Sequence, residues 1–311
     1  MNAVCLFPGQ GSQYVGMGKE FHQHFHEVRH IFELASYILQ MDLSRLCFEG
    51  PESLLARTDN VQPAITVMNL ACLHVAKEAG IIPVTVAGHS LGEYTALQSA
   101  GVLSLEDTIR LVHQRGLSMQ EAADAHPGGM IAVIGLEFDQ CREVCEKAEK
   151  VGVVDIANHN SRLQVILSGE IAALQAASKI AKQSGAKLIV PLKVSGPWHS
   201  RFMMSASEKM RDTLTVCPMR PPVFPVVSSL TGEFYQSVEQ IRTCLVEQVL
   251  RPVRWVTTLE RLIQEGHRVF VEVGPGRVLS GLMRDYGKDL KVMNVEKMDD
   301  LTKIGTMASS P

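Results

Sequence analysis

Residues 88–92, Gly-His-Ser-Leu-Gly, constrain the fold of this chain more than any other segment. They follow an apolar run at 84–87, which has the length of a buried strand, and they precede a stretch at 93–100 that is compatible with a helix. A serine on a tight strand-to-helix turn between glycines is a nucleophile elbow, which exposes the hydroxyl and aims backbone N–H groups at the reacting oxygen. The pattern also occurs in ordinary glycine turns, so the flanking strand and helix are what favour a nucleophile at Ser90.

Strand and helix signals alternate along the rest of the chain. We expect a buried strand at 3–7, a glycine-rich loop at 9–13, a polar helical pattern at 18–39 and an amphipathic one at 62–79. The last third has strand signals at 223–227 and 269–273, helical signals at 238–249 and 255–265, and a Gly-Pro-Gly turn at 274–276 that opens a final helix. This alternation predicts an α/β protein with a largely parallel sheet.

After the Pro-Gly-Gly turn at 127–129, the predicted strands and helices become shorter. These shorter units are a strand at 130–134, a helix at 139–150, strands at 153–157 and 163–168, a helix at 171–184 and a strand at 187–192. The order β-α-β-β-α-β is the ferredoxin-like pattern. The sequence therefore predicts a large domain of residues 1–127 and 195–311 with a small ferredoxin-like domain, 128–194, inserted into it. The tail after Asp299 is expected to be loosely held.

Composition excludes several classes of function. The formal net charge of -3 argues against a nucleic-acid-binding protein, and no basic patch interleaved with aromatic residues is present. The first residues do not resemble a signal peptide, and no apolar stretch is long enough to cross a membrane. The 7 cysteines are scattered and odd in number, as in reduced cytosolic proteins. We expect a cytoplasmic protein with no nucleic-acid or membrane partner, in which Cys141 and Cys145 are ordinary helix residues.

A nucleophilic serine needs a base, and the chain has 11 histidines. His22 and His26 are four residues apart on a polar helical pattern, but no third ligand accompanies them, so we interpret them as a solvated face and predict no metal site. His89 belongs to the elbow and is expected to shape the site. His199 follows Gly-Pro-Trp at 196–198, in a loop at the predicted domain junction. A loop histidine is usually structural, but an elbow serine with no other base makes His199 the favoured general base.

Five motifs together resemble the malonyl-CoA:acyl carrier protein transacylase family. They are Phe-Pro-Gly-Gln-Gly-Ser-Gln at 7–13, the elbow with Glu-Tyr after it at 88–94, Arg-Gly at 115–116, Trp-His-Ser at 198–200 and Val-Gly-Pro-Gly at 273–276. The match covers nearly the whole chain in order. The resemblance implies an α/β-hydrolase-like large domain with an inserted ferredoxin-like small domain, and a free-standing enzyme of fatty acid or polyketide synthesis.

The resemblance also implies a role for each residue that matches a family motif. Ser90 attacks the thioester carbonyl and carries the acyl group as an ester, while His199 removes its proton. The backbone carbonyl of Gln248 orients His199 in place of a carboxylate. The backbone N–H groups of Gln10 and Leu91 form the oxyanion hole, which accounts for the glycines on both sides of Gln10. No cofactor and no metal is implied.

Arg115 and Trp198 bear on the choice of acyl group. An arginine after an amphipathic run such as 105–114 is most often a surface charge. In the family, however, an arginine at this place clamps the free carboxylate of malonyl, which favours a dicarboxylic acyl group over acetyl or fatty acyl groups. Trp198 stands where malonyl-selective members often have phenylalanine, and we expect it to line the pocket with His89. Its larger ring either narrows the pocket against methylmalonyl or indicates another extender.

The predicted function is transfer of malonyl from malonyl-CoA, through an ester on Ser90, to the phosphopantetheine thiol of an acyl carrier protein. Two alternatives use the same residues. One is an editing acyl hydrolase of a polyketide pathway, in which water releases the acyl group, and Arg115 disfavours it. The other is a transacylase for another acyl-CoA extender. A non-catalytic docking module is disfavoured by the complete set of Gln10, Ser90, Leu91, Arg115 and His199.

Overall fold

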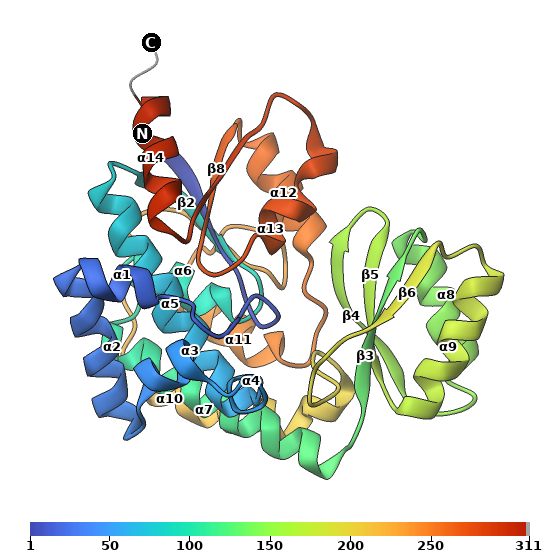
Figure 1. Ribbon diagram of the computed structural model, residues 1–311. Coiled ribbons are helices and arrows are strands. Elements are labelled where there is room, and N and C mark those ends of the chain that lie inside the picture. Colours follow the sequence, from blue (N-terminus) through green and yellow to red (C-terminus); the bar gives the residue numbers. More distant parts are fainter. Residues whose placement is uncertain (309–311) are drawn as a thin grey trace.

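The computed structural model describes residues 1–308 and contains two sheets (Figure 1). The larger sheet has the order β7-β2-β1-β8-β9, and all of its pairings are parallel. Its strands are β1 (Asn2–Phe7), β2 (Ile82–Gly88), β7 (Val226–Val227), β8 (Val269–Val273) and β9 (Lys291–Val295). The central strand, β1, is where the chain changes direction across the sheet, and the carboxyl ends of strands at such a point form a natural crevice.

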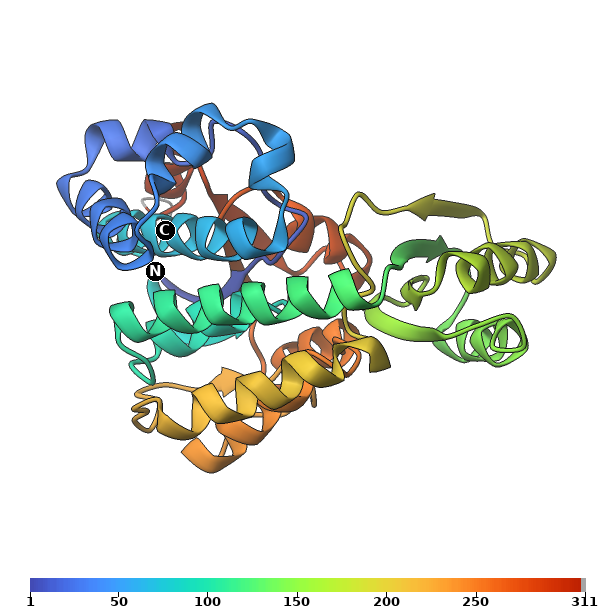
Figure 2. The ribbon, with the colours of Figure 1, turned by 90° about the horizontal axis from the view of Figure 1, so that it is seen from below.

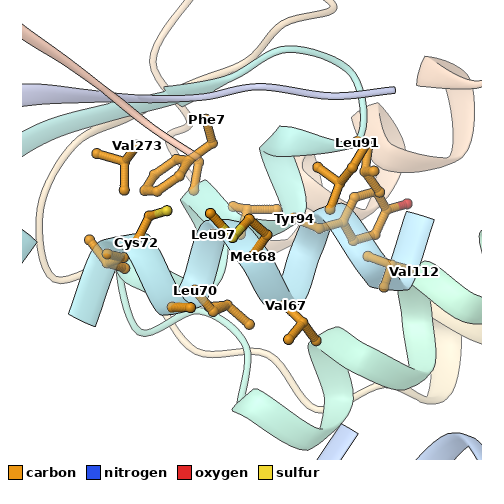
Figure 3. Close-up of a cluster of buried hydrophobic side chains, with 14 of the residues drawn as sticks. Phe7, Val67, Met68, Leu70, Cys72, Leu91, Tyr94, Leu97, Val112 and Val273 are labelled. Carbon is orange, nitrogen blue, oxygen red and sulfur yellow. The ribbon is translucent and has the colours of Figure 1, made fainter. Parts of the chain in front are cut away.

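Helices cover both faces of this sheet, so β1 is buried on both sides. Ala3, Cys5 and Phe7 face one core, whereas Val4 and Leu6 face the other. The first core, part of which is drawn in Figure 3, packs the sheet against α5 (Thr58–Glu78), α6 (Gly92–Ser99) and α7 (Leu105–Ala125). The second packs it against α12 (Trp255–Gln264) and α13 (Val278–Leu282). Burial on both faces explains why β1 is a continuous apolar run from Ala3 to Phe7 and not an alternating pattern.

The helical pattern expected at 18–39 forms two helices and not one. They are α1 (Lys19–His24) and α2 (His26–Leu39), and Phe25 separates them because its backbone is extended, with φ -112° and ψ 123°. The other helices of the large domain are α3 (Leu43–Glu49), α4 (Glu52–Leu55), α10 (Met204–Val216), α11 (Val238–Gln248) and the short 3₁₀ turns η1 (Arg201–Met203) and η2 (Arg284–Tyr286).

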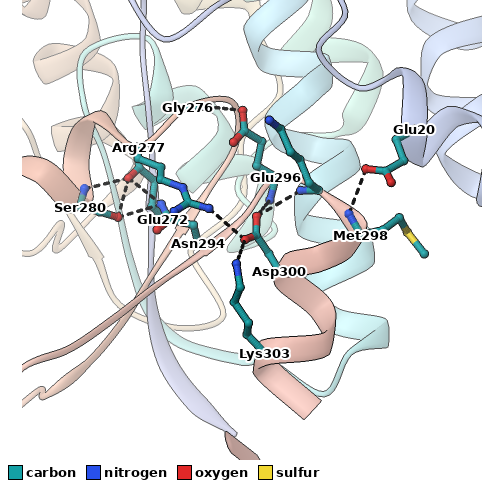
Figure 4. A network of polar contacts seen from close by, with 11 residues as sticks. Glu20, Glu272, Gly276, Arg277, Ser280, Asn294, Glu296, Met298, Asp300 and Lys303 are labelled. Carbon is teal, nitrogen blue, oxygen red and sulfur yellow. Dashed lines mark hydrogen bonds and ion pairs between the residues drawn. The ribbon is translucent and has the colours of Figure 1, made fainter. Parts of the chain in front are cut away.

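The C-terminal region differs from the prediction. The helix after the Gly-Pro-Gly turn, α13, is not the last element, because β9 and α14 (Met298–Ala308) follow it. Asp300 of α14 accepts hydrogen bonds from the backbone of Glu296 and Lys297 and pairs with Arg277 (Figure 4). The expectation of a loosely held tail after Asp299 is therefore wrong for the first turns of α14, where Asp300 is hydrogen-bonded and Ile304 is buried, and residues 309–311 lie outside the described residues.

The smaller sheet has the order β4-β5-β3-β6 and is antiparallel throughout. Its elements are β3 (Gly129–Ile134), α8 (Phe138–Ala148), β4 (Val154–Ser161), β5 (Gln164–Gly169), α9 (Ile171–Gln183) and β6 (Leu188–Pro191), the predicted ferredoxin-like order. One face packs on α8 and α9, and the other packs on Met119, Trp198 and Val249 of the large domain. Figures 1 and 2 both show this unit at one side of the molecule.

Two sets of contacts fix the small sheet to the large domain beside the site. The backbone N–H of Val253 donates to Ala157 O at 2.9 Å, and the N–H of His159 donates to Val253 O at 2.8 Å. On the same strand, Asp155 accepts hydrogen bonds from the guanidinium of Arg201, which lies two residues after His199. The space between the two units therefore has defined walls. Within the described residues, none of the helices has the length and apolar character needed to cross a membrane.

Candidate active site

The predicted elbow is present between β2 and α6, and its backbone strain lies at the serine itself. Ser90 has φ 51°, in the left-handed region that residues other than glycine rarely adopt. The flanking positions 88 and 92 require glycine because other backbone atoms lie very close to them, and not because of a positive φ. A Cβ atom on Gly88 would lie 2.0 Å from the carbonyl carbon of Gly92, and one on Gly92 would lie 2.0 Å from the backbone oxygen of Phe7. No side chain fits at either position.

The glycine-rich loop after β1 lies directly against this elbow. The backbone N–H of His89 donates to Phe7 O at 2.9 Å, and a Cβ atom on Gly9 would lie only 2.5 Å from His89 O. Gly11 has φ 105°, which a side chain would disfavour. Gln10 and Leu91 consequently line the same cavity as Ser90. Their assignment as backbone donors of an oxyanion hole is consistent with this placement and stays a prediction.

A cavity of roughly 220 Å³ lies between the two sheets, with Ser90 in its wall. The small sheet contributes both polar and apolar side chains to the cavity wall, whereas the segment before His199 contributes apolar ones. The predicted residues that line it are Gln10, His89, Ser90, Leu91, Arg115, Trp198 and His199, together with the unpredicted Asn158, Asn160 and Gln164. Gln248 does not line the cavity but contacts three of the residues that do, His199, Ser90 and Arg115.

Ser90 and His199 form a hydrogen-bonded pair inside this cavity. Ser90 Oγ lies 2.7 Å from His199 Nε2, and His199 Nδ1 lies 2.8 Å from the backbone oxygen of Gln248. A carbonyl can only accept, so Nδ1 carries the hydrogen and Nε2 presents its lone pair to the serine hydroxyl. Burial, reinforced by the charge of Arg115, lowers the pKa of His199 to about 3. The imidazole is therefore neutral at physiological pH, which is the form that accepts a proton.

We expect the pH profile of acylation to reflect this lowered pKa. In the free enzyme, kcat/KM for an acyl-CoA reports the ionisation of the essential base. An ordinary histidine would lose activity as the pH falls through about 6.5, whereas His199, with its pKa lowered by burial, should stay neutral well below that pH. The measurement is kcat/KM from about pH 8 to about pH 5, where a flat profile is expected. An acid limb near the ordinary histidine pKa would contradict the lowered pKa of His199.

Arg115 is buried and points at the nucleophile. The helix that begins with the amphipathic run at 105–114 continues to Ala125, so Arg115 lies inside α7 with only 1% of its surface exposed, and it is not a surface charge. One amino group of its guanidinium donates to Ser90 Oγ at 3.0 Å and to Gln248 Oε1 at 3.1 Å. The other donates to Gln62 Oε1 at 2.9 Å, and the guanidinium lies 5.7 Å from the ring centre of Tyr94.

His89 and Trp198 form part of the cavity wall. Trp198 is 4% exposed and packs in the core shared by the small sheet and the large domain. His89 Nε2 lies 2.9 Å from Asn160 Oδ1, and its ring contacts Trp255 at 5.3 Å between ring centres. Burial lowers the pKa of His89. Its Nε2 is held by Asn160 and not by Ser90, which is consistent with a role in shaping the site, and that role stays a prediction.

The other histidine and cysteine pairs do not form ligand sets. His22 and His26 lie on different helices, and His22 packs against the rings of Phe32 and Phe48. Cys141 and Cys145 are buried in the core of the small sheet. No cluster of three or more histidine, cysteine or acidic side chains that could hold a metal ion occurs in the part of the chain that the structure describes.

Local sequence patterns did not indicate the neighbours of Arg115. Gln62 precedes a proline within an apolar helix, and Tyr94 and Glu93 follow the elbow, yet all are fully or almost fully buried around the guanidinium or Gln248. A polar residue in an otherwise buried helix, such as Gln62 in α5, is the one signal that was available, since buried amides are retained where they make hydrogen bonds.

A strained serine hydrogen-bonded to a neutral histidine, set over a parallel α/β sheet, is the arrangement of enzymes that form an acyl ester on a serine. The model of the acyl transferase domain family matches residues 4–309, and the chain belongs to this family. This confirms the resemblance seen in the sequence.

Named relatives and solved structures agree with this family. The malonyl CoA-acyl carrier protein transacylase of Bacillus subtilis is 41% identical over 291 residues, which are 93% of this chain and 92% of the relative. The solved transacylase of the same name from Clostridium perfringens has a TM-score of 0.94 at 38% identity, over 99% of this chain and 97% of that one. A malonyl-transacylase solved with a type II polyketide synthase acyl carrier protein has a TM-score of 0.95 at 38% identity, over 99% and 100% of the two chains. The predicted fold class is confirmed, whereas the domain boundaries at 128 and 195 stay a prediction.

Proposed function

We propose that this protein transfers malonyl from malonyl-CoA to the phosphopantetheine thiol of an acyl carrier protein, with Ser90 as the acyl carrier. The observation that carries the choice of acyl group is the position of Arg115. Its guanidinium is buried, lies 3.0 Å from Ser90 Oγ and contacts two amide oxygens. Within residues 1–308 it makes no ion pair with a carboxylate. An acyl group with a free carboxylate supplies the missing partner in a bidentate geometry.

The site can carry out both halves of the transfer. His199 Nε2 takes the proton of Ser90 as Oγ attacks the thioester carbon, and the backbone N–H groups of Gln10 and Leu91 stabilise the negative oxygen that forms. Collapse breaks the C–S bond, and the coenzyme A sulfur leaves with the proton held by His199. In the second half, the carrier thiol gives its proton to His199 and attacks the ester, and Ser90 Oγ recovers the proton.

Acyl transfer to a thiol is favoured over the hydrolytic alternative. The named relatives are transacylases, and one was solved with an acyl carrier protein.

The seven cysteines of this chain are all buried and unpaired, which is typical of a reducing compartment. We therefore place the enzyme in the cytoplasm, with malonyl-CoA and an acyl carrier protein as its partners.

Replacing Arg115 with alanine tests the choice of acyl group. Malonyl transfer should collapse, because hydrogen bonds to a charged group contribute about 1.5–3 kcal/mol each and more in a desolvated site. Acetyl transfer should be kept or rise, because acetyl has no carboxylate to pair with the guanidinium. The measurement is kcat/KM for malonyl-CoA and acetyl-CoA in both proteins.

Arg115→Lys serves as the matched control for this substitution. It should restore malonyl transfer only in part, because an ammonium group lacks the planar fork of the guanidinium. Equal losses for malonyl and acetyl in Arg115→Ala would show that Arg115 supports the structure or the chemistry in general, and the malonyl assignment would lose its support.

A further inference from the structure

Glu93 is a buried carboxylate beside the dyad to which the reaction above assigns no role. It lies in the first turn of α6, is fully buried, and its oxygens face only donors. Tyr235 donates its hydroxyl to Oε1 at 2.6 Å, and Ser229 donates its hydroxyl to Oε2 at 2.7 Å and its N–H to Oε1 at 3.2 Å. The fourth donor is the side-chain amide of Gln248. Burial raises the pKa of Glu93, and these hydrogen bonds oppose that shift.

The carboxylate determines which way the Gln248 amide points. Gln248 Nε2 donates to Glu93 Oε2 and, at 3.0 Å, to the backbone oxygen of Ser90, while its Oε1 accepts from Arg115 at 3.1 Å. In the reversed orientation, Oε1 would face a carboxylate and Nε2 would face a guanidinium. Both contacts would be repulsive, since an ionised carboxylate only accepts and a guanidinium only donates. By binding Gln248 Nε2, Glu93 thus keeps the acceptor oxygen of the same amide, Gln248 Oε1, facing the guanidinium of Arg115.

This arrangement leaves Arg115 available to a ligand. Its two amino groups contact neutral amide oxygens, on Gln62 and Gln248, and not a carboxylate that would compete with a substrate. A buried guanidinium with no counter-charge is costly. Burial lowers the pKa of Arg115, and the Glu93 carboxylate is among the groups that oppose this shift. The Glu93 carboxylate, separated from Arg115 by the Gln248 amide, stabilises the charged guanidinium and leaves its substrate-facing side open.

We propose that Glu93 is a positioning residue for recognition of the substrate carboxylate: it orients the Gln248 amide and acts as the remote counter-charge of Arg115. This inference rests on the proposed function, because it concerns how the same guanidinium receives a malonyl group. His199 is oriented by the backbone oxygen of Gln248 and not by its side chain. The side chain of Gln248 therefore links Glu93 to substrate recognition, whereas the backbone oxygen of Gln248 orients the base, His199.

Glu93→Gln tests the role of the Gln248 side chain in substrate recognition separately from the role of its backbone carbonyl in orienting His199. It preserves the size of the side chain but removes the charge and leaves one acceptor oxygen. The backbone N–H of Ser229, which cannot reorient, takes that oxygen, so an NH2 group faces Gln248 Nε2 and the Gln248 amide loses its preferred orientation. We expect kcat/KM for malonyl-CoA to fall about 10- to 100-fold, as for loss of a hydrogen bond to a charged group, mainly through KM. Acylation by acetyl-CoA should change much less, so the malonyl-to-acetyl ratio falls. A merely structural defect would lower both substrates alike.

Tyr235→Phe is the matched control. It removes a hydrogen bond to the same carboxylate but touches neither Gln248 nor the cavity. Its thermal stability should fall while the malonyl-to-acetyl ratio stays at the wild-type value. If Glu93→Gln does not fold, Gln248→Met removes the amide and retains the backbone carbonyl, and it should lower the same ratio.

The outcomes distinguish this inference from the proposed function. A wild-type enzyme that shows no preference for malonyl would refute the proposed function itself. A wild-type preference that persists unchanged in Glu93→Gln, or in Gln248→Met should the first variant not fold, would overturn the role of Glu93 alone. A lowered ratio in Tyr235→Phe equal to that in Glu93→Gln would also overturn it, because the effect would then follow the carboxylate's packing and not its contact with Gln248.

Discussion

Ser90→Ala is expected to abolish the acyl-enzyme. In the wild-type protein, brief mixing with malonyl-CoA should add one malonyl group to a peptide that contains Ser90, and the variant should show no such addition. Removing a serine nucleophile that acts as one unit with its base costs on the order of 10⁴-fold or more in turnover. The loss should be the largest among these substitutions, because within the described residues Ser90 Oγ is the hydroxyl that is hydrogen-bonded to His199 Nε2. Mass spectrometry of the intact protein and its peptides measures the adduct.

Ser99→Ala is the control for this substitution. Ser99 is the last residue of α6, the helix that follows the elbow, and its hydroxyl donates to Ala96 O at 2.7 Å. Its replacement should leave both the adduct and the transfer rate close to wild type. An adduct that persists in Ser90→Ala would assign the nucleophile to a different residue.

Fold prediction from the sequence succeeded where elements are apolar and failed where they are not. The strand at 269–273 was predicted with the bounds that β8 has, because its residues are almost all apolar. By contrast, α10 was missed because it buries only Ala206, Ser207, Met210 and Leu214 within a polar sequence. The strand β9 pairs only with β8 and carries Lys291 and Asn294, so its pattern is weak. Tertiary packing determines these elements, and no local signal marks them.

The site shows the same division between local and long-range information. The elbow at 88–92 and the loop at 9–13 are contiguous motifs, so their sequence alone indicated that they carry chemistry. The environment of Arg115 depends instead on residues 53 and 133 positions away, Gln62 and Gln248. Burial of the guanidinium likewise depends on how far α7 extends, and the amphipathic run ends before Arg115 while the helix continues. Such contacts follow from the fold and cannot be inferred from spacing.

His199→Ala should lower the acylation rate about 10²–10⁴-fold, which is the usual contribution of a general base. In the part of the chain that the structure describes, His199 Nε2 is the one base in contact with Ser90 Oγ, at 2.7 Å. The other side chain hydrogen-bonded to that oxygen is Arg115, which donates and cannot accept a proton. Binding of malonyl-CoA should persist, because the substitution leaves Arg115 in place. The expected signature is thus a loss in kcat, measured by rapid mixing at saturating malonyl-CoA.

The matched control for the base is His26→Ala, since His26 is exposed on α2 and should be dispensable. The result to compare is the ratio of acylation rates in the two variants, with circular dichroism to show that both are folded. If His199→Ala keeps more than about a tenth of the wild-type rate, general-base catalysis by this residue is too small to account for the dyad. His89 would then be the candidate base, because it lines the same cavity, but it would first have to leave Asn160, to which its Nε2 is bound at 2.9 Å. Retention of activity in His199→Ala but not in a His89→Ala, His199→Ala double variant would reveal that exchange.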